Sequence, residues 1–136
     1  MGQRICIPVE EVDHTIHILR DGPFTNPDDC GLDCQPSTAG GTLWAWGYNG
    51  NGGLGDVTTT NKSVPTLIGG TDLWLNVSAG DAHAFAVKNN YTLWGWGLNG
   101  DGQLGDGTTT FRSTPSRIGS SRWRRAAAKE QMSLGI

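Results

Sequence analysis

Residues 43–56 read Leu-Trp-Ala-Trp-Gly-Tyr-Asn-Gly-Asn-Gly-Gly-Leu-Gly-Asp, and residues 93–106 read Leu-Trp-Gly-Trp-Gly-Leu-Asn-Gly-Asp-Gly-Gln-Leu-Gly-Asp. The similarity extends further, because residues 43–69 and 93–119 align without a gap and 17 of the 27 aligned positions are identical. A period of about fifty residues, with tryptophans and glycines in phase, is typical of a propeller or a solenoid. The sequence therefore predicts a fold made of repeated units.

The composition favours short strands joined by tight turns. The 136 residues include 21 glycines and 6 tryptophans, and only 36% of them are hydrophobic. A glycine-rich chain with many threonines and asparagines is typical of β-structure. The formal net charge of −3 argues against the strongly basic surface that nucleic acids and anionic membranes attract. We therefore expect an all-β protein that binds neither nucleic acid nor a membrane.

The chain shows no targeting segment. Residues 1–9 lack an apolar stretch long enough for a conventional secretion signal, and no stretch is long enough to span a membrane. The three cysteines are an odd number and define no disulfide framework. We expect the protein in the cytoplasm or as part of a virion or another assembly.

Apolar residues predict the strands of the repeat. Residues 43–47 and 93–97 are expected to be short strands that are apolar on both faces, which places them in a stack of sheets. Residues 14–18 read His-Thr-Ile-His-Ile, and they correspond to residues 83–87 and 132–136. Further strands are expected at 65–68 and 74–80 and at their equivalents, 115–118 and 123–128.

The first unit is longer than the second. The histidine strand begins 29 residues before the Leu-Trp strand in the first unit, but 10 residues before it in the second. The extra residues, 23–38, are rich in Asp, Pro, Gly and Cys, which is typical of a surface loop. We therefore expect an N-terminal strand or arm with this inserted loop over 1–41, followed by repeats over 42–91 and 92–136, of which the second is incomplete.

Each of the tryptophans has a partner one repeat away. Burying one indole removes roughly 200 Å² of surface from water, worth at most about 5 kcal/mol. Residues that recur with the period are most simply core residues. The expected structural core of the repeat comprises Trp44, Trp46, Trp74, His83, Trp94, Trp96 and Trp123.

Residues 93–107, with Ser113, Pro115 and Ile118 after them, closely resemble the repeat of the regulator of chromosome condensation family. Residues 74–83, which contain Trp, Val-Ser-Ala-Gly and His, resemble the segment that precedes this motif. The resemblance implies blades of four antiparallel strands, several of which form a circular β-propeller, usually with seven blades. It also implies that faces and loops of the disc bind protein partners, without covalent catalysis.

The chain holds about two such blades, far fewer than a ring needs. A terminal blade leaves an apolar face in water unless another unit covers it. Lys129 and Met132 stand where Gly80 and His83 stand one repeat earlier, so the last strand departs from the pattern. We expect either a homo-oligomer that completes a ring or stack, or a piece of a longer product. Head-to-tail copies could continue the repeat, because the strands of His14 and Met132 are equivalent.

The glycine-rich loops 50–55 and 100–105 both spell G-x-G-x-x-G. A dinucleotide site is not expected, because threonines and a proline follow each loop instead of a helix. The glycines suit a long turn whose backbone is hydrogen-bonded by Asn49 and Asp56. We therefore expect no cofactor.

The second loop carries four polar residues that suggest calcium: Asn99, Asp101, Gln103 and Asp106. An EF-hand loop requires Gly at its sixth position and Glu at its twelfth, where this chain has Leu104 and Thr110. Only a calcium site of another kind is left open.

His14, His17, Cys30 and Cys34 are weak candidates for zinc ligands. His-x₂-His and Cys-x₃-Cys are near metal-ligand spacings, and the two pairs bracket the inserted loop. An extended strand would project the two histidines to opposite sides. A Cys30–Cys34 disulfide and free thiols are the alternatives, and we expect no metal.

No arrangement for nucleophilic catalysis stands out. His83 lies near many serines and threonines, but its place in the repeat predicts a buried, hydrogen-bonded side chain. We therefore do not expect an enzyme.

These observations favour a non-enzymatic propeller-repeat module for protein–protein interaction, with a structural or scaffolding role in a larger homo-oligomeric assembly such as a virion. The alternative is a regulatory factor that resembles the family's guanine-nucleotide exchange factor or its enzyme inhibitors. The expected partner-binding residues lie in the loops and in the insert: Asp28, Asp29, Tyr48, Asn51, Leu98, Asp101, Gln103, Phe111 and Arg112.

Overall fold

The computed structural model describes residues 40–130 and 132–136 and the backbone of residues 14–19. It consists of nine strands joined by turns: β1 (His14–Leu19), β2 (Thr42–Gly47), β3 (Lys62–Ile68), β4 (Trp74–Ala79), β5 (His83–Lys88), β6 (Leu93–Gly97), β7 (Arg112–Arg117), β8 (Ala126–Lys129) and β9 (Met132–Gly135). The all-β prediction is confirmed. Among these residues no helix is long and apolar enough to cross a membrane. The expected arm over 1–12 and the inserted loop 23–38 lie outside the described residues.

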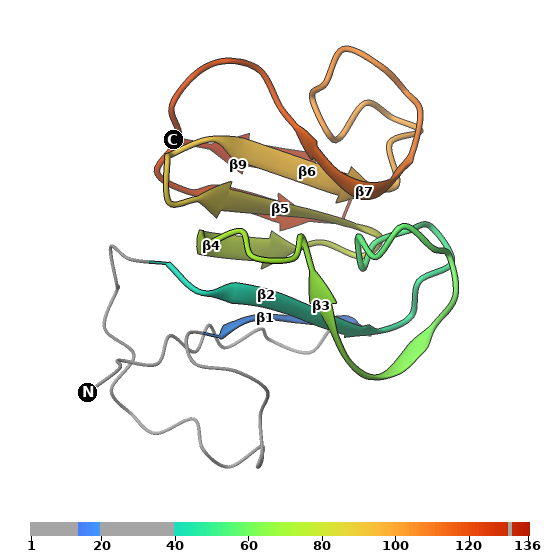
Figure 1. The fold of residues 1–136 in the computed structure, drawn as a ribbon. Helices are drawn as coiled ribbons and strands as arrows, with labels where there is room; N and C mark the ends of the chain where they lie inside the picture. Colours follow the sequence, from blue (N-terminus) through green and yellow to red (C-terminus); the bar gives the residue numbers. More distant parts are fainter. Residues whose placement is uncertain (1–13, 20–39, 131) are drawn as a thin grey trace, which may run out of the picture.

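The strands form three antiparallel sheets. The first sheet has the order β1-β2-β3, the second β4-β5-β6-β7, and the third contains β8 and β9. β1 contacts β4, and β8 contacts both β4 and β5, so the second sheet lies between the other two. Figure 1 shows the first sheet at the bottom and the C-terminus at the opposite end. The four-stranded antiparallel unit expected from the sequence is confirmed.

The repeat in the sequence and the sheet in space are out of phase by two strands. Residues 42–91 supply β2 and β3 to the first sheet and β4 and β5 to the second. Equivalent strands keep the same register: His14 lies opposite Gly47 in the first sheet, and His83 lies opposite Gly97 in the second. Each sequence repeat therefore ties two neighbouring sheets together covalently.

The core consists of one apolar layer on each side of the second sheet. Along β5, Ala84 and Ala86 belong to the cluster shared with the first sheet, whereas Phe85 and Val87 belong to the cluster shared with the third. This division follows from the alternation of side chains along a strand. Because the second sheet is covered on both faces, its central strands are almost entirely apolar.

The six tryptophans are not equally buried. Trp74 and Trp96 are fully buried in the first layer, where their rings meet edge to face with 6.2 Å between centroids. The other four are half-buried: Trp44, Trp46, Trp94 and Trp123. Both fully buried indoles belong to the second sheet, although Trp94 of the same sheet is only half-buried.

Candidate functional site

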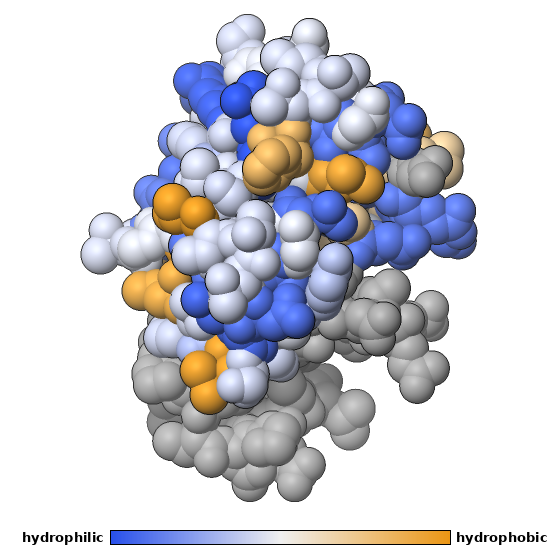
Figure 2. All heavy atoms as spheres, turned by 90° about the vertical axis from the view of Figure 1, so that its right-hand side faces the viewer, coloured by the Kyte–Doolittle hydropathy of each residue, from blue (hydrophilic) through white to orange (hydrophobic). Residues whose placement is uncertain are grey.

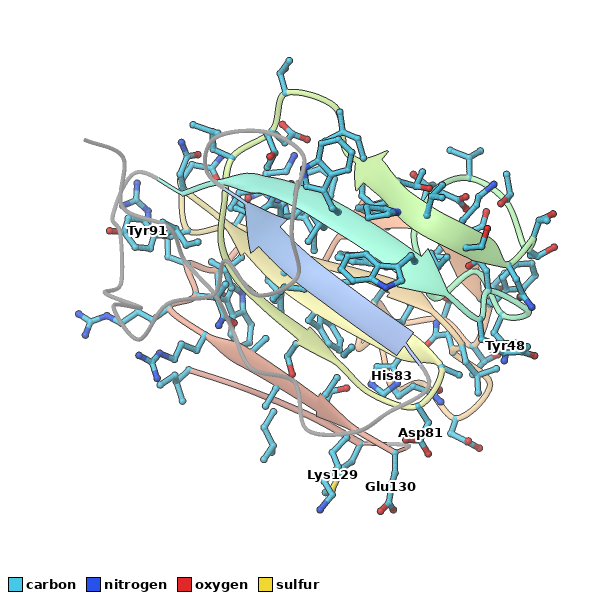
Figure 3. All side chains as sticks on the ribbon, turned by 90° about the horizontal axis from the view of Figure 1, so that it is seen from below. Tyr48, Asp81, His83, Tyr91, Lys129 and Glu130 are labelled. Carbon is cyan, nitrogen blue, oxygen red and sulfur yellow. The ribbon has the colours of Figure 1, made fainter. Side chains whose placement is uncertain are left out.

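Two long loops lie at one end of the sheets. The loop 48–61 joins β2 to β3, the loop 98–111 joins β6 to β7, and both lie on the right-hand side of Figure 1. In Figure 3, Tyr48 lies at the same end as Asp81 and Glu130, and Tyr91 lies at the opposite end. We call the end that carries the two loops the loop face.

A buried asparagine holds each loop in shape. The Nδ2 atom of Asn49 donates to Asp56 Oδ1 at 2.9 Å and to the carbonyl oxygen of Thr58 at 3.0 Å, and its Oδ1 accepts from the backbone N–H of Leu54 at 3.0 Å. Asn99 makes the equivalent bonds in the second loop. As predicted, these side chains replace backbone partners, so both loops are rigid supports for the residues they expose.

A carboxylate closes each network. Burial raises the pKa of Asp106, but hydrogen bonds from Thr108 and Arg112 outweigh this effect and hold the pKa well below its ordinary 3.8. Arg112 binds Asp106 Oδ2 through Nε at 3.0 Å and Nη2 at 2.8 Å. In the first loop, Lys62 Nζ lies 3.1 Å from Asp56 Oδ2. Burial raises the pKa of Asp56, but hydrogen bonds from Thr58, Lys62 and Asn49 outweigh this effect and lower it. Both carboxylates therefore stay charged at neutral pH and support structure.

Several large side chains stand exposed on these loops. Tyr48 is 48% exposed, Phe111 52% and Val57 74%. Figure 2 views the loop face and shows isolated apolar residues among polar ones. Single aromatic residues on a rigid, mixed surface are typical anchors for a protein partner.

The predicted partner-binding residues are therefore partly brought together. Tyr48, Asp101 and Phe111 are exposed, whereas Asn51 and Leu98 are half-buried. Two others are engaged within the chain: Arg112 with Asp106, and the buried Gln103 with the backbone N–H of Asp101 at 3.0 Å. Asp28 and Asp29 lie outside the described residues.

His83 is buried and hydrogen-bonded, as expected from its place in the repeat. Its Nε2 lies 3.0 Å from Ser133 Oγ, and Ser133 Oγ donates to the carbonyl oxygen of Gln103 at 2.8 Å. A hydroxyl has one proton, so His83 must donate through Nε2 to the serine. A histidine that donates to a serine cannot act as its base. The pair therefore joins β5, β9 and the second loop, and it is not a nucleophile–base pair.

Burial lowers the pKa of His83, and the negative charge of Asp81 and a backbone interaction at Met132 only partly oppose this. The imidazole is accordingly neutral at pH 7. Its Nδ1 has no hydrogen-bond partner among the described residues.

The described residues contain no group of three His, Cys, Asp or Glu that could hold a metal ion. The zinc hypothesis is not tested by this, because Cys30, Cys34 and the side chains of His14 and His17 lie outside them. For the same reason the predicted Cys30–Cys34 alternative stays a prediction.

A cleft of about 430 Å³ opens between the second and third sheets. Phe85 and Leu93 line it from the second sheet. Leu104 from the loop 98–111, Ile118 after β7 and Trp123 before β8 line it as well. The sequence reasoning missed this cleft as a site. The sequence analysis expected a terminal blade to leave an apolar face uncovered, and this could have indicated the cleft. It did not, however, name the residues of that face.

Comparison with known families agrees with the repeated strands and loops described above. A family model described as "Regulator of chromosome condensation (RCC1) repeat" matches residues 40–87 and 92–134, and a second model of the same description matches residues 74–103. No curated protein matches the chain.

Three solved structures share the fold. Prp20p from Saccharomyces cerevisiae, studied with its binding to Gsp1p and histones, has a TM-score of 0.66 and 17% identity over 98% of this chain and 32% of its own. Yeast RCC1 (Prp20) in complex with Kap60 has a TM-score of 0.63 and 13% identity over 91% and 28%. Human WBSCR16 has a TM-score of 0.60 and 19% identity over 85% and 26%. The chain thus spans about a quarter to a third of the length of these proteins, and at such identities the likeness shows the fold alone.

Proposed function

We propose that this chain, which belongs to the regulator of chromosome condensation (RCC1) repeat family, is a protein-interaction module that binds its partner through the loop face. RCC1 repeat proteins are generally non-enzymatic interaction or exchange-factor proteins, and we extend the non-enzymatic character to this chain. Prp20p, which shares the fold, binds Gsp1p and histones, and Kap60 binds yeast RCC1. These relatives support a protein as the partner class.

The observation that carries the proposal is the contrast between loops hydrogen-bonded by buried asparagines and the exposed side chains on the same loops. Asn49 and Asn99 are fully buried and fix the two loops, while Tyr48 and Phe111 on the same loops remain about half exposed. Side chains on a fixed backbone lose little conformational entropy when they bind, so aromatic anchors here bind efficiently. Because the loop face carries both apolar and polar groups, it suits a folded protein surface better than a lipid or a polyanion.

A scaffolding role follows if one chain offers this face to several partners or to several copies of one partner. The setting of a virion, and the regulatory alternative of an exchange factor or enzyme inhibitor, stay predictions from the sequence. Neither is needed for the loop-face proposal.

The test is partner capture by matched variants. The double variant Tyr48→Ala and Phe111→Ala removes the two aromatic anchors, and Leu73→Ser changes a side chain of similar exposure (40%) outside the two loops. A protein that is captured by the original chain and by Leu73→Ser, but at least tenfold less by the double variant, supports the proposal. Equal capture by a correctly folded double variant contradicts it.

A further inference from the structure

Val57, on the loop 48–61, combines a strained backbone with an exposed side chain. Its φ is 73°, in the left-handed region. There the Cβ of an L-residue crowds a backbone carbonyl oxygen, and a β-branched residue in this region is a genuine outlier. The side chain is 74% exposed, so it gains little from packing. The valine therefore lowers the stability of the fold without a matching gain from burial.

The second loop shows what this position requires. The repeat equivalent of Val57 is Gly107, whose φ is 79°. In both loops the residue follows an aspartate whose Oδ1 accepts from the backbone N–H two residues later. Glycine adopts a positive φ without steric strain because it has no Cβ. The loop conformation thus requires a positive φ, but it does not require a valine.

The other two non-glycine residues with positive φ in the described part of the chain lie between paired strands. Tyr91, with φ of 66°, lies between β5 and β6, and its N–H donates to the carbonyl oxygen of Lys88 at 2.9 Å. Glu130, with φ of 46°, lies between β8 and β9. Tight turns between antiparallel strands often need a positive φ. Neither of these residues is β-branched, so Val57 is the unusual one.

The backbone of Val57 joins the two loops, but its side chain is not needed for this. The N–H of Val57 donates to the carbonyl oxygen of Ser113, at the start of β7, at 2.8 Å. A glycine would make the same hydrogen bond. The bond also places the valine beside the end of the second loop, because Ser113 comes two residues after Phe111, which is 52% exposed.

Hydrogen bonds on both sides of Val57 hold the strained conformation. Asn49 Nδ2 donates to the carbonyl oxygens of Thr58 at 3.0 Å and Thr60 at 3.2 Å. Asp56 Oδ1 accepts from the N–H of Thr58 at 3.0 Å. The backbone cannot relax to a negative φ without disturbing these bonds. The isopropyl group is therefore held in place before any partner arrives, which lowers the entropy lost on binding.

The segments next to Val57 carry no charged side chain. Residues 57–61 read Val-Thr-Thr-Thr-Asn, and residues 107–111 read Gly-Thr-Thr-Thr-Phe. The carboxylates just before them, of Asp56 and Asp106, are paired with basic side chains at 3.1 and 2.8 Å. An apolar group among hydroxyl and amide groups resembles the core and rim of a protein interface. A nucleic acid or an anionic membrane would need basic side chains here.

We propose that Val57 is an apolar anchor for the protein partner of the loop face. The partner offers an uncharged apolar pocket that takes the isopropyl group of Val57 beside the ring of Phe111. This inference rests on the function proposed above, and it adds a residue and the chemistry of the contact. A residue that lowers stability at an exposed position, where glycine would serve the fold better, is explained by a contact outside the chain.

The variant Val57→Gly separates folding from binding. It places the residue of the second loop in the first, and it removes both the strain and the side chain. We expect the midpoint of thermal unfolding to rise by roughly 2–6 °C. We expect the affinity for the partner to fall about fivefold or more, because the apolar contact is lost. A lower midpoint would show that the valine supports the fold, and it would overturn the proposal.

The variant Val57→Thr tests the apolar character alone. Threonine keeps the β-branch and the strain, so the thermal midpoint should stay within roughly 2 °C of the original. The affinity should fall about threefold or more, because a hydroxyl replaces a methyl group in the pocket. The matched control is Val64→Thr, which makes the same change on β3 at a valine that is 64% exposed. Equal affinities of the two threonine variants would overturn the proposal.

The probe is the protein captured by the original chain in the loop-face test, purified and titrated against each variant by calorimetry. Titrations of the original chain in about 0.1 M and about 0.5 M salt should give affinities within about threefold of each other, because the contact is uncharged. A loss of about tenfold or more in high salt would indicate a contact dominated by charge, and it would overturn the partner chemistry.

The outcomes distinguish this inference from the loop-face function. A partner that binds Val57→Gly as tightly as the original chain, but is lost with the double variant of Tyr48 and Phe111, contradicts only the role of Val57. If no protein is captured, or if the double variant binds as tightly as the original chain, the loop-face function fails and the anchor role of Val57 fails with it.

Discussion

The stack has two junctions: the first lies between the first and second sheets, and the second lies between the second and third sheets. Each junction has a loop of the same sequence pattern, but the surroundings of the two loops differ. In both loops a buried asparagine makes the same hydrogen bonds, to the aspartate seven residues later and to the leucine N–H five residues later. Trp96 covers only the first loop, and the equivalent place over the second loop is a cleft. The difference teaches that the loop conformation is local, whereas the packing above it depends on the next strand.

The largest difference in stability between the two junctions is expected from changes at Trp96 and at Trp123. Trp96→Ala removes a fully buried indole and leaves the Gly53 carbonyl without its donor, so we expect it to lower the free energy of unfolding by about 3–5 kcal/mol. Trp123→Ala, at the second junction, removes a half-buried indole and should cost about half as much. Urea unfolding followed by circular dichroism measures both, and equal losses would show that the two junctions are equally packed.

The repeat and its strands could be predicted from the sequence because they depend on local patterns. Apolar residues on both faces and their recurrence after fifty residues placed β2 and β6, and the polar Asn49 and Asp56 in a glycine-rich turn indicated side chains that bond the loop backbone. The cleft could not be predicted, because it depends on which strands cover Leu104 and not on the residues around it. The burial of Gln103 was missed for another reason: its side-chain oxygen accepts from the backbone N–H of Asp101, in a loop whose sequence indicates polar surface.

Asparagine-to-alanine changes test whether each loop is held by the hydrogen bonds of its own asparagine. Asn49→Ala and Asn99→Ala each leave the buried N–H of a leucine and several carbonyl groups unpaired, which should cost about 2–3 kcal/mol at either site. The measurement is the urea midpoint of each variant. A loss at Asn49 less than half of that at Asn99 would indicate that Trp96, and not the local network, holds the first loop.

A pair of glycine variants separates backbone strain from contact with the indole. Gly55 and Gly105 both have positive φ, 77° and 64°, so alanine at either position should cost about 1 kcal/mol in backbone strain. Only at Gly55 does the added Cβ meet Trp96, which should raise the total to about 2 kcal/mol. Thermal unfolding of the two variants makes the comparison. Equal losses at the two sites would mean that Trp96 yields without cost.

The smallest expected effect concerns the histidine that ties β5 to β9 at the second junction. Burial, the largest cause, holds the pKa of His83 below its ordinary 6.5 in the folded chain. The unfolded chain therefore binds more protons, so stability is fully present above pH 6.5 and falls as the pH drops below 6.5 toward the folded-state pKa. Asp56 and Asp106 do not contribute in this range, because their lowered pKa values lie below 3.8.

The urea midpoint of the original chain should decrease as the pH is lowered from 7.5 to 5. The variant His83→Gln, which keeps a donor for Ser133, should show a weaker dependence on pH. If the urea midpoint of the glutamine variant depends on pH as strongly as that of the original chain, another group binds the proton. His83 would then not be the residue whose protonation loosens the third sheet.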